Sequence, residues 1–297
     1  MSAKVGFPFG SSNANDSVGL IGIGLLGSAI GERLLDSAYT VFGFDPVANL
    51  SAFAANGGAI CSTGYDVASQ CSRVVLSLPD STVVRSVVDE LRSVLSGRTL
   101  IDTTTGSPED TIAIAEKVRA AGGEYLDAMV AGSSAMMREH AATVLVGGSS
   151  EAFKANKVIF DAIGSKIFHL GGNGSGAKMK LVVNLAIGLN RAVLGEALAF
   201  GESFGFDSHQ ILDVLINTPA HSDAMDIKGE KMAERDFAPQ ARLRQHLKDV
   251  RLILDSAKQN DAIVPLSTLH EQLLQSLVEA GRGEEDNSVV VEAFRRN

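Results

Sequence analysis

The stretch VGLIGIGLLGSAIGERLLD, residues 18–36, decides the fold of this chain of 297 residues. Residues 18–21 form a short apolar run that is typical of a buried strand, and residues 28–36 read as a helix. Between them lie Gly22, Gly24 and Gly27, which are spaced as Gly-x-Gly-x-x-Gly. In a strand–turn–helix context this spacing is typical of a dinucleotide-binding loop, in which the N-terminus of the helix faces the phosphates.

Each of the three glycines should have its own role in such a loop. Gly22 should permit the tight turn, Gly24 should let the backbone approach a pyrophosphate, and Gly27 should let the helix pack closely on the strand. The alternative is an ordinary glycine-rich turn between a strand and a helix. The candidate cofactor-binding residues of the loop are Gly22, Ile23, Gly24, Leu25, Leu26 and Gly27.

A second expected strand, residues 39–44, ends in Asp45. A carboxylate about twenty residues after such a loop can bind the ribose hydroxyls of an adenosine. No Lys or Arg lies between Arg33 and Arg73, so a 2′-phosphate would meet Asp45 without a cation nearby in the sequence. We therefore expect NAD as the cofactor, in preference to NADP. The alternative is that Asp45 only caps an Asp-Pro turn.

Strands and helices keep alternating as far as residue 170, which predicts an α/β fold with a doubly wound, mostly parallel sheet. The further expected strands are residues 73–78, 98–101, 124–126, 143–146 and 166–170, and the further helices are residues 81–95, 108–121 and 150–163. Ligands bind beyond the carboxyl ends of parallel strands, so the loops after these strands should line one crevice. Those loops contain Gly22, Asp45, Leu78, Thr105 and Ala131.

A long apolar helix is expected over residues 177–204, after Gly174, Ser175 and Gly176. Apolar residues lie nearly all round it, so we expect it to be buried on most of its surface. It is long enough to cross a membrane, but its charged residues argue against that, because charges within a membrane are costly. Lys180 and Asn184 are four residues apart and emerge from one helical face. The alternative to a functional role is that Lys180 pairs with a carboxylate on another helix.

The remainder of the chain shows no convincing strand. The expected helices are residues 207–217, 240–259 and 265–280, with a short last helix after Asp286 and a less regular stretch that contains Pro219 and Pro239. The sequence therefore predicts three parts. These are a disordered tail over residues 1–17, a Rossmann-type dinucleotide-binding domain over residues 18–173, and an all-helical domain for substrate binding and oligomerisation over residues 174–297.

Composition and charge exclude several classes of protein. The net charge of −9 argues against a nucleic-acid surface, which needs a basic patch. Cys61 and Cys71 match no metal or redox spacing, so we expect two small buried residues in a reducing compartment. The histidines show no metal-ligand spacing, and residues 1–17 lack the features of a signal or transit peptide. We expect a cytoplasmic protein without a metal, a membrane or a nucleic-acid partner.

Six segments together resemble the β-hydroxyacid dehydrogenase family, which contains 3-hydroxyisobutyrate dehydrogenase and tartronate semialdehyde reductase and is related to 6-phosphogluconate dehydrogenase. Residues 19–27 resemble its G-x-I-G-x-G-x-M-G opening, and residues 101–105 resemble its I-D-x-S-T segment. Residues 127–133 resemble its D-A-P-V-S-G-G loop, and residues 174–184 resemble its G-x-G-x-x-x-K-x-x-x-N signature. The other two segments are a Leu-Pro loop, Leu78 and Pro79, and a Lys-Asp pair, Lys248 and Asp249.

The resemblance implies roles for several residues. Lys180 would be the catalytic lysine, and Asn184 would act beside it on the substrate. The implied cofactor-binding residues, besides the glycine loop and Asp45, are Leu78, Pro79, Asp80, Thr105 and Lys248. The implied substrate-binding residues are Ala131, Gly132, Ser133, Lys180 and Asn184. Met129 stands where the family has Pro, and Ala131 where it usually has Ser, so Ser133 would supply the hydroxyl.

The implied activity is reversible hydride transfer between a nicotinamide cofactor and the alcohol carbon of a small hydroxy acid similar to 3-hydroxyisobutyrate, with Lys180 as general acid and base. Two alternatives are an imine reductase on the same fold and a non-catalytic NAD-binding scaffold. The presence of both Lys180 and Asn184 argues against them. Family members assemble as dimers or tetramers, so we expect a homodimer or a homotetramer.

Overall fold

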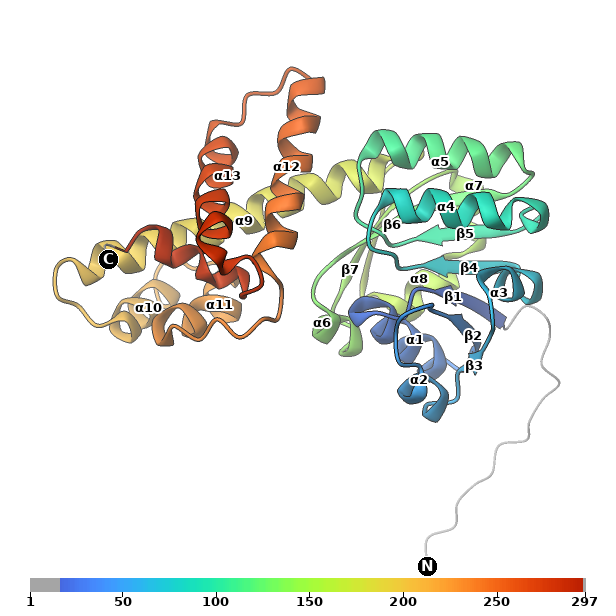
Figure 1. Ribbon diagram of the computed structural model, residues 1–297, viewed down its shortest axis with the longest axis horizontal. Helices are drawn as coiled ribbons and strands as arrows, with labels where there is room; N and C mark the ends of the chain where they lie inside the picture. Colours follow the sequence, from blue (N-terminus) through green and yellow to red (C-terminus); the bar gives the residue numbers. More distant parts are fainter. Residues whose placement is uncertain (1–16, 296–297) are drawn as a thin grey trace, which may run out of the picture. The chain divides into compact units, whose positions relative to one another are not determined.

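The computed structural model describes residues 17–295 and contains an α/β unit and a helical unit (Figure 1). The first compact unit ends at Lys180 and the second begins at Leu181, so the division falls inside the long helix α9 (Ser175–Glu202). The division expected from the sequence lies between residues 173 and 174, just before that helix. The predicted tail lies outside the described residues except for Ser17, which begins the first strand.

The first unit is built on an eight-stranded sheet with the order β3-β2-β1-β4-β5-β6-β7-β8. The strands are β1 (Ser17–Ile21), β2 (Thr40–Phe44), β3 (Ala59–Ile60), β4 (Arg73–Leu76), β5 (Thr99–Asp102), β6 (Glu124–Ala131), β7 (Thr143–Gly147) and β8 (Lys166–His169). Every neighbouring pair is parallel except β6 and β7. The predicted doubly wound, mostly parallel sheet is confirmed.

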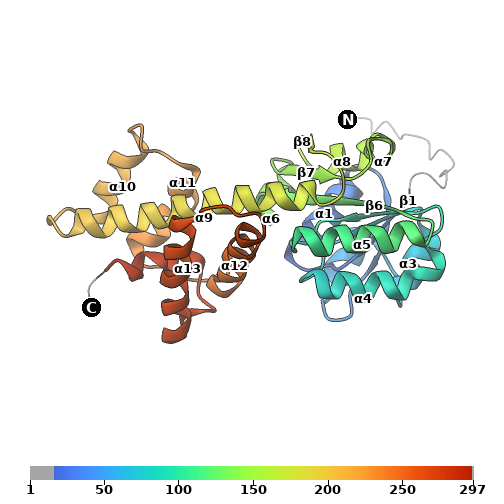
Figure 2. The same ribbon diagram turned by 90° about the horizontal axis from the view of Figure 1, so that it is seen from above.

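Helices cover both faces of this sheet, and Figure 2 shows α4 and α5 on one side with α7 and α8 on the other. The helices of the first unit are α1 (Leu25–Asp36), α2 (Ser51–Ala55), α3 (Gly64–Gln70), α4 (Ser81–Leu91), α5 (Pro108–Ala120), α6 (Ser134–Arg138), α7 (Ser150–Ala155) and α8 (Lys157–Ile163). A 3-10 turn, η2 (Arg92–Val94), follows α4.

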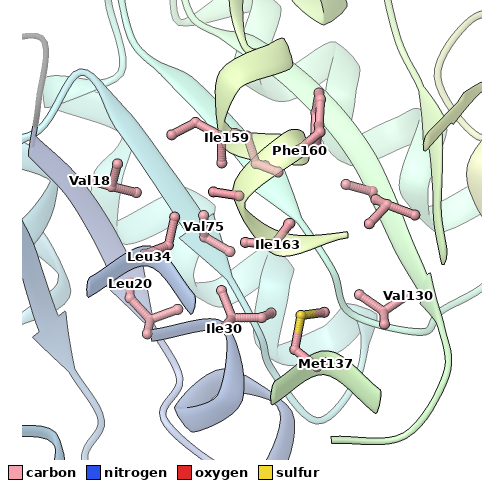
Figure 3. Close-up of a cluster of buried hydrophobic side chains, with 14 of the residues drawn as sticks. Val18, Leu20, Ile30, Leu34, Val75, Val130, Met137, Ile159, Phe160 and Ile163 are labelled. Atoms are coloured by element: carbon pink, nitrogen blue, oxygen red, sulfur yellow. The ribbon is translucent and has the colours of Figure 1, made fainter. Parts of the chain in front are cut away.

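Each face of the sheet has its own hydrophobic core, because successive side chains of a strand point to opposite faces. Leu20 and Val75 pack with Ile30 of α1 and Phe160 of α8, as Figure 3 shows. Val74 instead belongs to the second core, which the helices α3, α4 and α5 close. Burial on both faces explains why these strands read as continuous apolar runs rather than as alternating patterns.

The second unit is mostly helical, as predicted. Beyond α9 its helices are α10 (Ser208–Ile216), α11 (Asp223–Glu234), α12 (Leu243–Gln259) and α13 (Pro265–Leu277), followed by the π-helical η3 (Val278–Arg282) and the 3-10 helix η4 (Asn287–Ala293). Leu194 and Leu198 of α9 pack with Leu212, Leu247 and Leu274 in one buried cluster. Between residues 181 and 295 the structure contains no strand, only an isolated bridge between residues 242 and 286.

Several predicted elements were wrong in extent. Helix α11 occupies part of the stretch expected to be irregular, since a segment with Gly229 and many charged residues has only a weak apolar pattern. Helix α12 begins at Leu243 rather than at residue 240. One helix was predicted over residues 150–163, but Asn156 divides it, and its side chain donates to the carbonyl oxygen of Ala152 at 2.8 Å. The short elements α2, β3, α3 and α6 were not predicted.

Helix α9 is less buried than its composition suggested. Ala177, Leu181, Leu194 and Leu198 are buried, but a second set of apolar side chains on the helix is 37–65% exposed: Met179, Val182, Ile187, Val193 and Phe200. The prediction of burial on most of the surface is therefore wrong, because an all-round apolar pattern does not tell which sides another element of the chain covers. Within residues 17–295, α9 is the one helix that is long and apolar enough to cross a membrane, by length and composition alone.

The two cysteines differ in burial. Cys71 is 1% exposed, as predicted, and its burial raises the pKa of its thiol to about 11. Cys61 is only half-buried, so the prediction is wrong for this residue, which lies beside the short strand β3. Burial also raises the pKa of the Cys61 thiol, and the charge of Asp66 adds to the rise.

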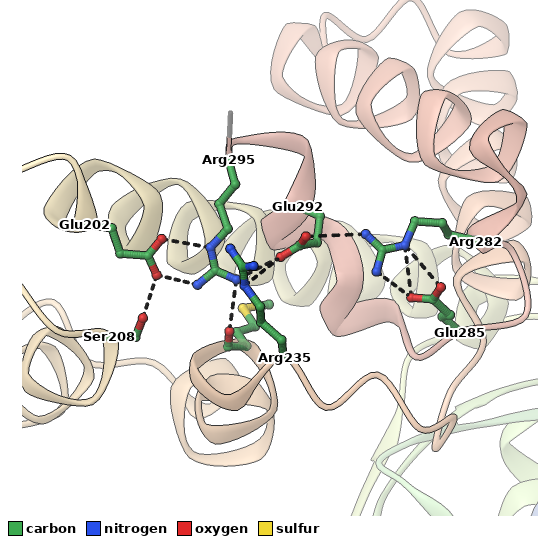
Figure 4. Close-up of polar contacts among 8 residues, drawn as sticks. Glu202, Ser208, Arg235, Arg282, Glu285, Glu292 and Arg295 are labelled. Atoms are coloured by element: carbon green, nitrogen blue, oxygen red, sulfur yellow. Dashed lines mark hydrogen bonds and ion pairs between the residues drawn. The ribbon is translucent and has the colours of Figure 1, made fainter. Parts of the chain in front are cut away.

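Ion pairs connect the C-terminal segment to the helices before it (Figure 4). The Nε of Arg295 donates to Glu202 of α9 at 2.8 Å, and its Nη1 donates to Glu292 at 2.9 Å. Glu292 also pairs with Arg282 at 3.5 Å, and Arg282 donates to Glu285 at 3.1 Å. The last described residues therefore belong to the packed helical unit.

Two histidines are buried beside an arginine in the second unit. His246 of α12 and His270 of α13 have ring centroids 5.1 Å apart, and Arg191 of α9 is 8% exposed. Burial, with a smaller contribution from the positive Arg191, lowers the pKa of His270 to about 4. The pKa of His246 is well below its ordinary value for the same reasons and because of His270. Both rings are therefore neutral in the folded protein near pH 7.

This pair predicts acid sensitivity in the helical unit. In the unfolded chain each histidine binds a proton as the pH falls below its ordinary pKa of about 6.5. In the folded chain both histidines stay neutral at that pH. The contribution of the neutral histidines to the free energy of unfolding is therefore present above pH 6.5. It is lost as the pH falls towards the pKa values of the folded protein. For His270 alone we expect the free energy of unfolding to drop by about 2 kcal/mol between about pH 7 and about pH 5.

Urea unfolding of the wild type and of His270→Gln at both pH values measures this contribution as a difference. The comparison with the variant cancels the contributions of other groups to the pH dependence of stability. One such group is the buried Asp102, whose raised pKa acts in the opposite sense. Equal pH dependence in the two proteins would contradict the prediction.

Candidate functional site

The glycine loop after β1 leaves open space at one position and none at two others. Gly22 has φ +92°, and a Cβ there would lie 2.2 Å from the carbonyl oxygen of Ser77. A Cβ at Gly27 would lie 2.0 Å from the carbonyl oxygen of Gly22. A Cβ at Gly24 would meet no atom within 4 Å. The turn and the close helix packing thus require glycine, and the space over Gly24 is the room that a pyrophosphate needs.

The N-terminus of α1 opens into this space. Its N-cap residue is Gly24, no side chain caps it, and its first turn contains no acidic residue. Its first N–H groups have no partner within the helix, so they can bind an anion. Of the other loop residues, Leu25 is 75% exposed, Leu26 is half-buried and Ile23 is buried. The residues present therefore fit the phosphates of a dinucleotide.

Asp45 joins the ends of β1 and β2. Its Oδ2 accepts a hydrogen bond from the N–H of Ile23 at 2.7 Å, and its Oδ1 accepts from Val47 and Ala48 at 2.8 Å each. Burial raises the pKa of the carboxyl, but these three N–H donors outweigh it and hold the pKa below its ordinary value. The capping alternative therefore describes real contacts. Oδ2 keeps acceptor capacity for a ribose hydroxyl, so the two roles are compatible.

The loops after β4 and β5 are hydrogen-bonded to each other. The N–H of Leu78 donates to the hydroxyl of Thr104 at 3.0 Å, and Pro79 follows it on the exposed surface. Asp80 caps α4 by accepting from the N–H groups of Thr82 at 2.9 Å and Val83 at 3.1 Å. Asp80 thus caps a helix, a structural role that was not expected from the sequence. Thr105 is half-buried and directly follows Thr104.

Asp102 was not singled out in the sequence, although it ends β5 beside these loops. It is 3% exposed, accepts from the N–H of Thr104 at 2.9 Å, and accepts from the hydroxyl of Tyr125. Burial raises its pKa to about 6 against these two donors. An acidic residue at the end of an apolar strand needs buried partners, and that signal could have identified it.

The expected substrate loop begins where β6 ends. Ala131 is the last residue of β6, Gly132 has φ +151°, and Ser133 is the N-cap of α6. The Ser133 Oγ accepts from the N–H of Met136 at 3.2 Å. Its O–H can still donate to a carboxylate. Both Gly132 and Ser133 are exposed, and Ala131 is half-buried.

Lys180 and Asn184 are both half-buried on the unbroken helix α9. The side-chain amide of Asn184 donates to Asp249 Oδ2 at 3.5 Å, so Asn184 contacts the Lys-Asp pair of α12 within the second unit. Lys248 precedes Asp249 on α12. Lys248 and the glycine loop belong to different compact units, so the approach of Lys248 to the cofactor stays a prediction. Residues 17–295 contain no group of three or more His, Cys, Asp or Glu side chains that could hold a metal ion.

Two family models match the chain. The model described as the NAD binding domain of 6-phosphogluconate dehydrogenase matches residues 17–171. The model described as NAD-binding of NADP-dependent 3-hydroxyisobutyrate dehydrogenase matches residues 174–294. Together they cover both compact units.

Named enzymes are similar over almost the whole chain. The chain is 30% identical over 285 residues to 2-(hydroxymethyl)glutarate dehydrogenase of Eubacterium barkeri, covering 94% of this chain and 95% of the relative. It is 29% identical to 2-hydroxy-3-oxopropionate reductase of Escherichia coli (strain K12), covering 93% and 96%. The crystal structure of 3-hydroxyisobutyrate dehydrogenase from Salmonella typhimurium has a TM-score of 0.87 at 25% identity, covering 94% and 99%.

These matches confirm the family that the six sequence segments indicated. They also agree with the eight-stranded sheet followed by a helical unit. The relatives are named for different hydroxy acids or their oxidised forms, whereas both family models are described as NAD-binding. The chain belongs to the β-hydroxyacid dehydrogenase family of NAD(P)-dependent oxidoreductases.

Proposed function

We propose that the chain transfers hydride reversibly between NAD and the alcohol carbon of a small hydroxy acid similar to 3-hydroxyisobutyrate. The observation that carries the proposal is the open space over Gly24, at the uncapped N-terminus of α1, in the same compact unit as Lys180. The open space at the helix N-terminus suits a dinucleotide, and Lys180 supplies a proton-transfer group. Neither feature alone would distinguish an enzyme from a binding protein.

The nicotinamide supplies the hydride chemistry when it is bound. Lys180 takes the hydroxyl proton of the substrate during oxidation and returns it during reduction. The amides of Gly132 and Ser133, with the Ser133 hydroxyl, hold the substrate carboxylate. Asn184, which already contacts Asp249, orients the substrate hydroxyl or carboxylate through its amide.

A turnover screen tests this function against its two alternatives. The purified protein is given NAD with 3-hydroxyisobutyrate, glycerate and 2-(hydroxymethyl)glutarate, and separately reduced cofactor with cyclic imines. We expect NAD to be reduced with at least one hydroxy acid, and we expect the reduced cofactor not to be oxidised in the presence of the imines. Turnover of the imines alone would favour the imine reductase, and NAD binding without turnover would favour the scaffold.

We expect a preference for NAD because Asp45 should bind the ribose hydroxyls and repel a 2′-phosphate. The ratio of kcat/KM for NAD to that for NADP should exceed one in the wild type and should fall in Asp45→Ser. The variant Asp36→Ser, at an exposed acid of α1, is a matched control that should keep the ratio. Because Asp45 also holds the N–H of Ile23, the melting temperature is measured on each sample. Equal use of both cofactors by the wild type would refute the assignment.

Self-association is the third part of the proposal. Val193 and Phe200 on α9 are 60% and 65% exposed, and they line a shallow hollow of about 620 Å³ with Phe294. Exposed apolar side chains that lie together often mark an interaction site, and we propose a second copy of the chain as the occupant of this hollow. Light scattering at micromolar concentration should give at least a dimer, and Val193→Glu should weaken it. Ile263→Glu, at a 92% exposed position elsewhere, should not. A monomeric wild type would contradict the proposal.

A further inference from the structure

The carboxylate of Asp127 connects strand β6 to the start of α9. The residue is 0% exposed. Its Oδ1 accepts a hydrogen bond from the N–H of Gly174 at 2.9 Å, and its Oδ2 accepts from the N–H of Ala177 at 3.0 Å. Both donors belong to the segment that begins α9, and both are distant from Asp127 in the sequence. The carboxylate therefore replaces a local cap at the N-terminus of this helix.

Glycines shape the space around this carboxylate. Gly147 of β7 is aligned with Asp127, and a Cβ there would lie 2.6 Å from each carboxylate oxygen. A Cβ at Gly176 would lie 2.9 Å from Oδ2 and 2.5 Å from the carbonyl oxygen of Leu145. Gly174 has φ +87°, a conformation that side chains disfavour. The Gly-x-Gly segment before Lys180 thus lets the helix approach the carboxylate closely.

The electrostatics of the contact favour the charged form of Asp127 on the helix side. A carboxylate at the N-terminus of a helix is stabilised by the N–H groups and by the helix dipole. Burial raises the pKa of Asp127, and hydrogen bonds from Gly174 and Ala177 oppose the rise. A neutral side chain of the same shape could satisfy only one of the two N–H donors, because an amide has a single acceptor oxygen.

We propose that Asp127 is a positioning residue for Lys180. The Asp127 carboxylate holds the first turn of α9 against β6 and thereby sets the position and rotation of the lysine. Lys180 follows Ala177 by less than one helical turn. The same strand ends at Ala131, where the expected substrate loop begins. One strand therefore supports both the proton-transfer group and the loop for the substrate carboxylate. This inference rests on the proposed function.

The variant Asp127→Asn tests it. The amide keeps the shape of the carboxylate but turns a donor towards one of the two N–H groups, so the first turn of α9 should shift. We expect kcat to fall by about 10²-fold, as small displacements of catalytic groups can cause, with the Kd for NAD nearly unchanged. Thr63→Ala removes the cap of α3 elsewhere in the first unit and is the matched control. It should lower the melting temperature and leave kcat unchanged.

A double-mutant cycle separates positioning from general support of the fold. If Asp127 acts through Lys180, Asp127→Asn should lower kcat little further in the Lys180→Ala background. Independent, multiplicative losses would overturn the inference, as would full activity of folded Asp127→Asn. Normal turnover by Lys180→Ala would instead refute the proposed role of the lysine, so the two failures are distinguishable.

Should Asp127→Asn fail to fold, Gly176→Ala provides the second test. Its methyl group would push the start of α9 away from Oδ2 while it keeps the carboxylate and a residue that favours helix. The expected result is again a lower kcat with unchanged NAD binding and non-additivity with Lys180→Ala. Wild-type kcat in this variant would overturn the inference.

Discussion

The Lys180→Ala variant is expected to turn over about 10²–10⁴-fold more slowly than the wild type, while it binds NAD nearly as well. The amine is the proton acceptor in oxidation and the proton donor in reduction, and no other group replaces it in the proposed mechanism. Lys180→Arg should fail as well, because a guanidinium stays protonated near neutral pH. The expected signature is a loss in kcat rather than in cofactor affinity.

The competing explanation is a structural ion pair, which predicts a different pattern. Removal of one partner of a buried pair leaves the other uncompensated, so the variant would lose stability. Activity would then fall only as far as the folded fraction falls. Melting temperature and kcat are therefore measured on the same sample, with NAD binding by titration. A folded Lys180→Ala protein that binds NAD and turns over normally would refute the catalytic role.

The Asp286→Ala variant should lose about 3–5 kcal/mol of unfolding free energy. The Asp286 carboxylate is 0% exposed and accepts from the Lys228 amine at 2.8 and 2.9 Å. It also accepts from the N–H groups of Gln240 and Ala241 at 2.9 Å each and of Ser288 at 3.1 Å. These donors outweigh burial and hold the pKa of Asp286 at about 2.

The loss is large because Lys228, whose side chain is 6% exposed, would keep a buried charge without its partner. Urea unfolding measures the effect, and Asp255→Ala, at an exposed acid of α12, is the control, with an expected change within about 0.5 kcal/mol. Adding Lys228→Met to Asp286→Ala should recover part of the loss, because the buried charge is then gone. A loss below about 1 kcal/mol in Asp286→Ala would contradict this account.

The glycine loop was predictable because its geometry is local. A strand, a turn and a helix within residues 18–36 determine which glycine must lack a side chain, and the clashes at Gly22 and Gly27 follow from that order. The role of Asp45 could not be assigned from the sequence alone, since one carboxylate can cap a turn and face a ribose at once. Its contact with Ile23 joins residues far apart in the sequence, which the Asp-Pro pattern alone does not indicate.

Asp127 and helix α11 show what local patterns leave out. The partners of Asp127 lie 47 and 50 residues further along the chain, so only the packing of α9 on the sheet reveals its role. In α11, Lys228 and Gly229 are buried together with Met225 and Met232, so the buried face of this helix does not read as an apolar pattern. Tertiary contacts decide such segments, because helix propensity is a weak signal over a short stretch.

The unbroken course of α9 has a consequence for which changes of length the chain can tolerate. Each residue advances a helix by about 1.5 Å and turns it by about 100°. A single deletion between Lys180 and Asn184 would therefore turn Asn184 by about 100° and shift it by about 1.5 Å relative to Lys180, although every remaining residue could stay helical. Substitutions on the exposed side of this turn preserve the spacing, whereas an insertion or deletion of any one residue does not. The four-residue spacing thus fixes the relative orientation of the two side chains. The chain should tolerate substitutions in this turn far more readily than insertions or deletions.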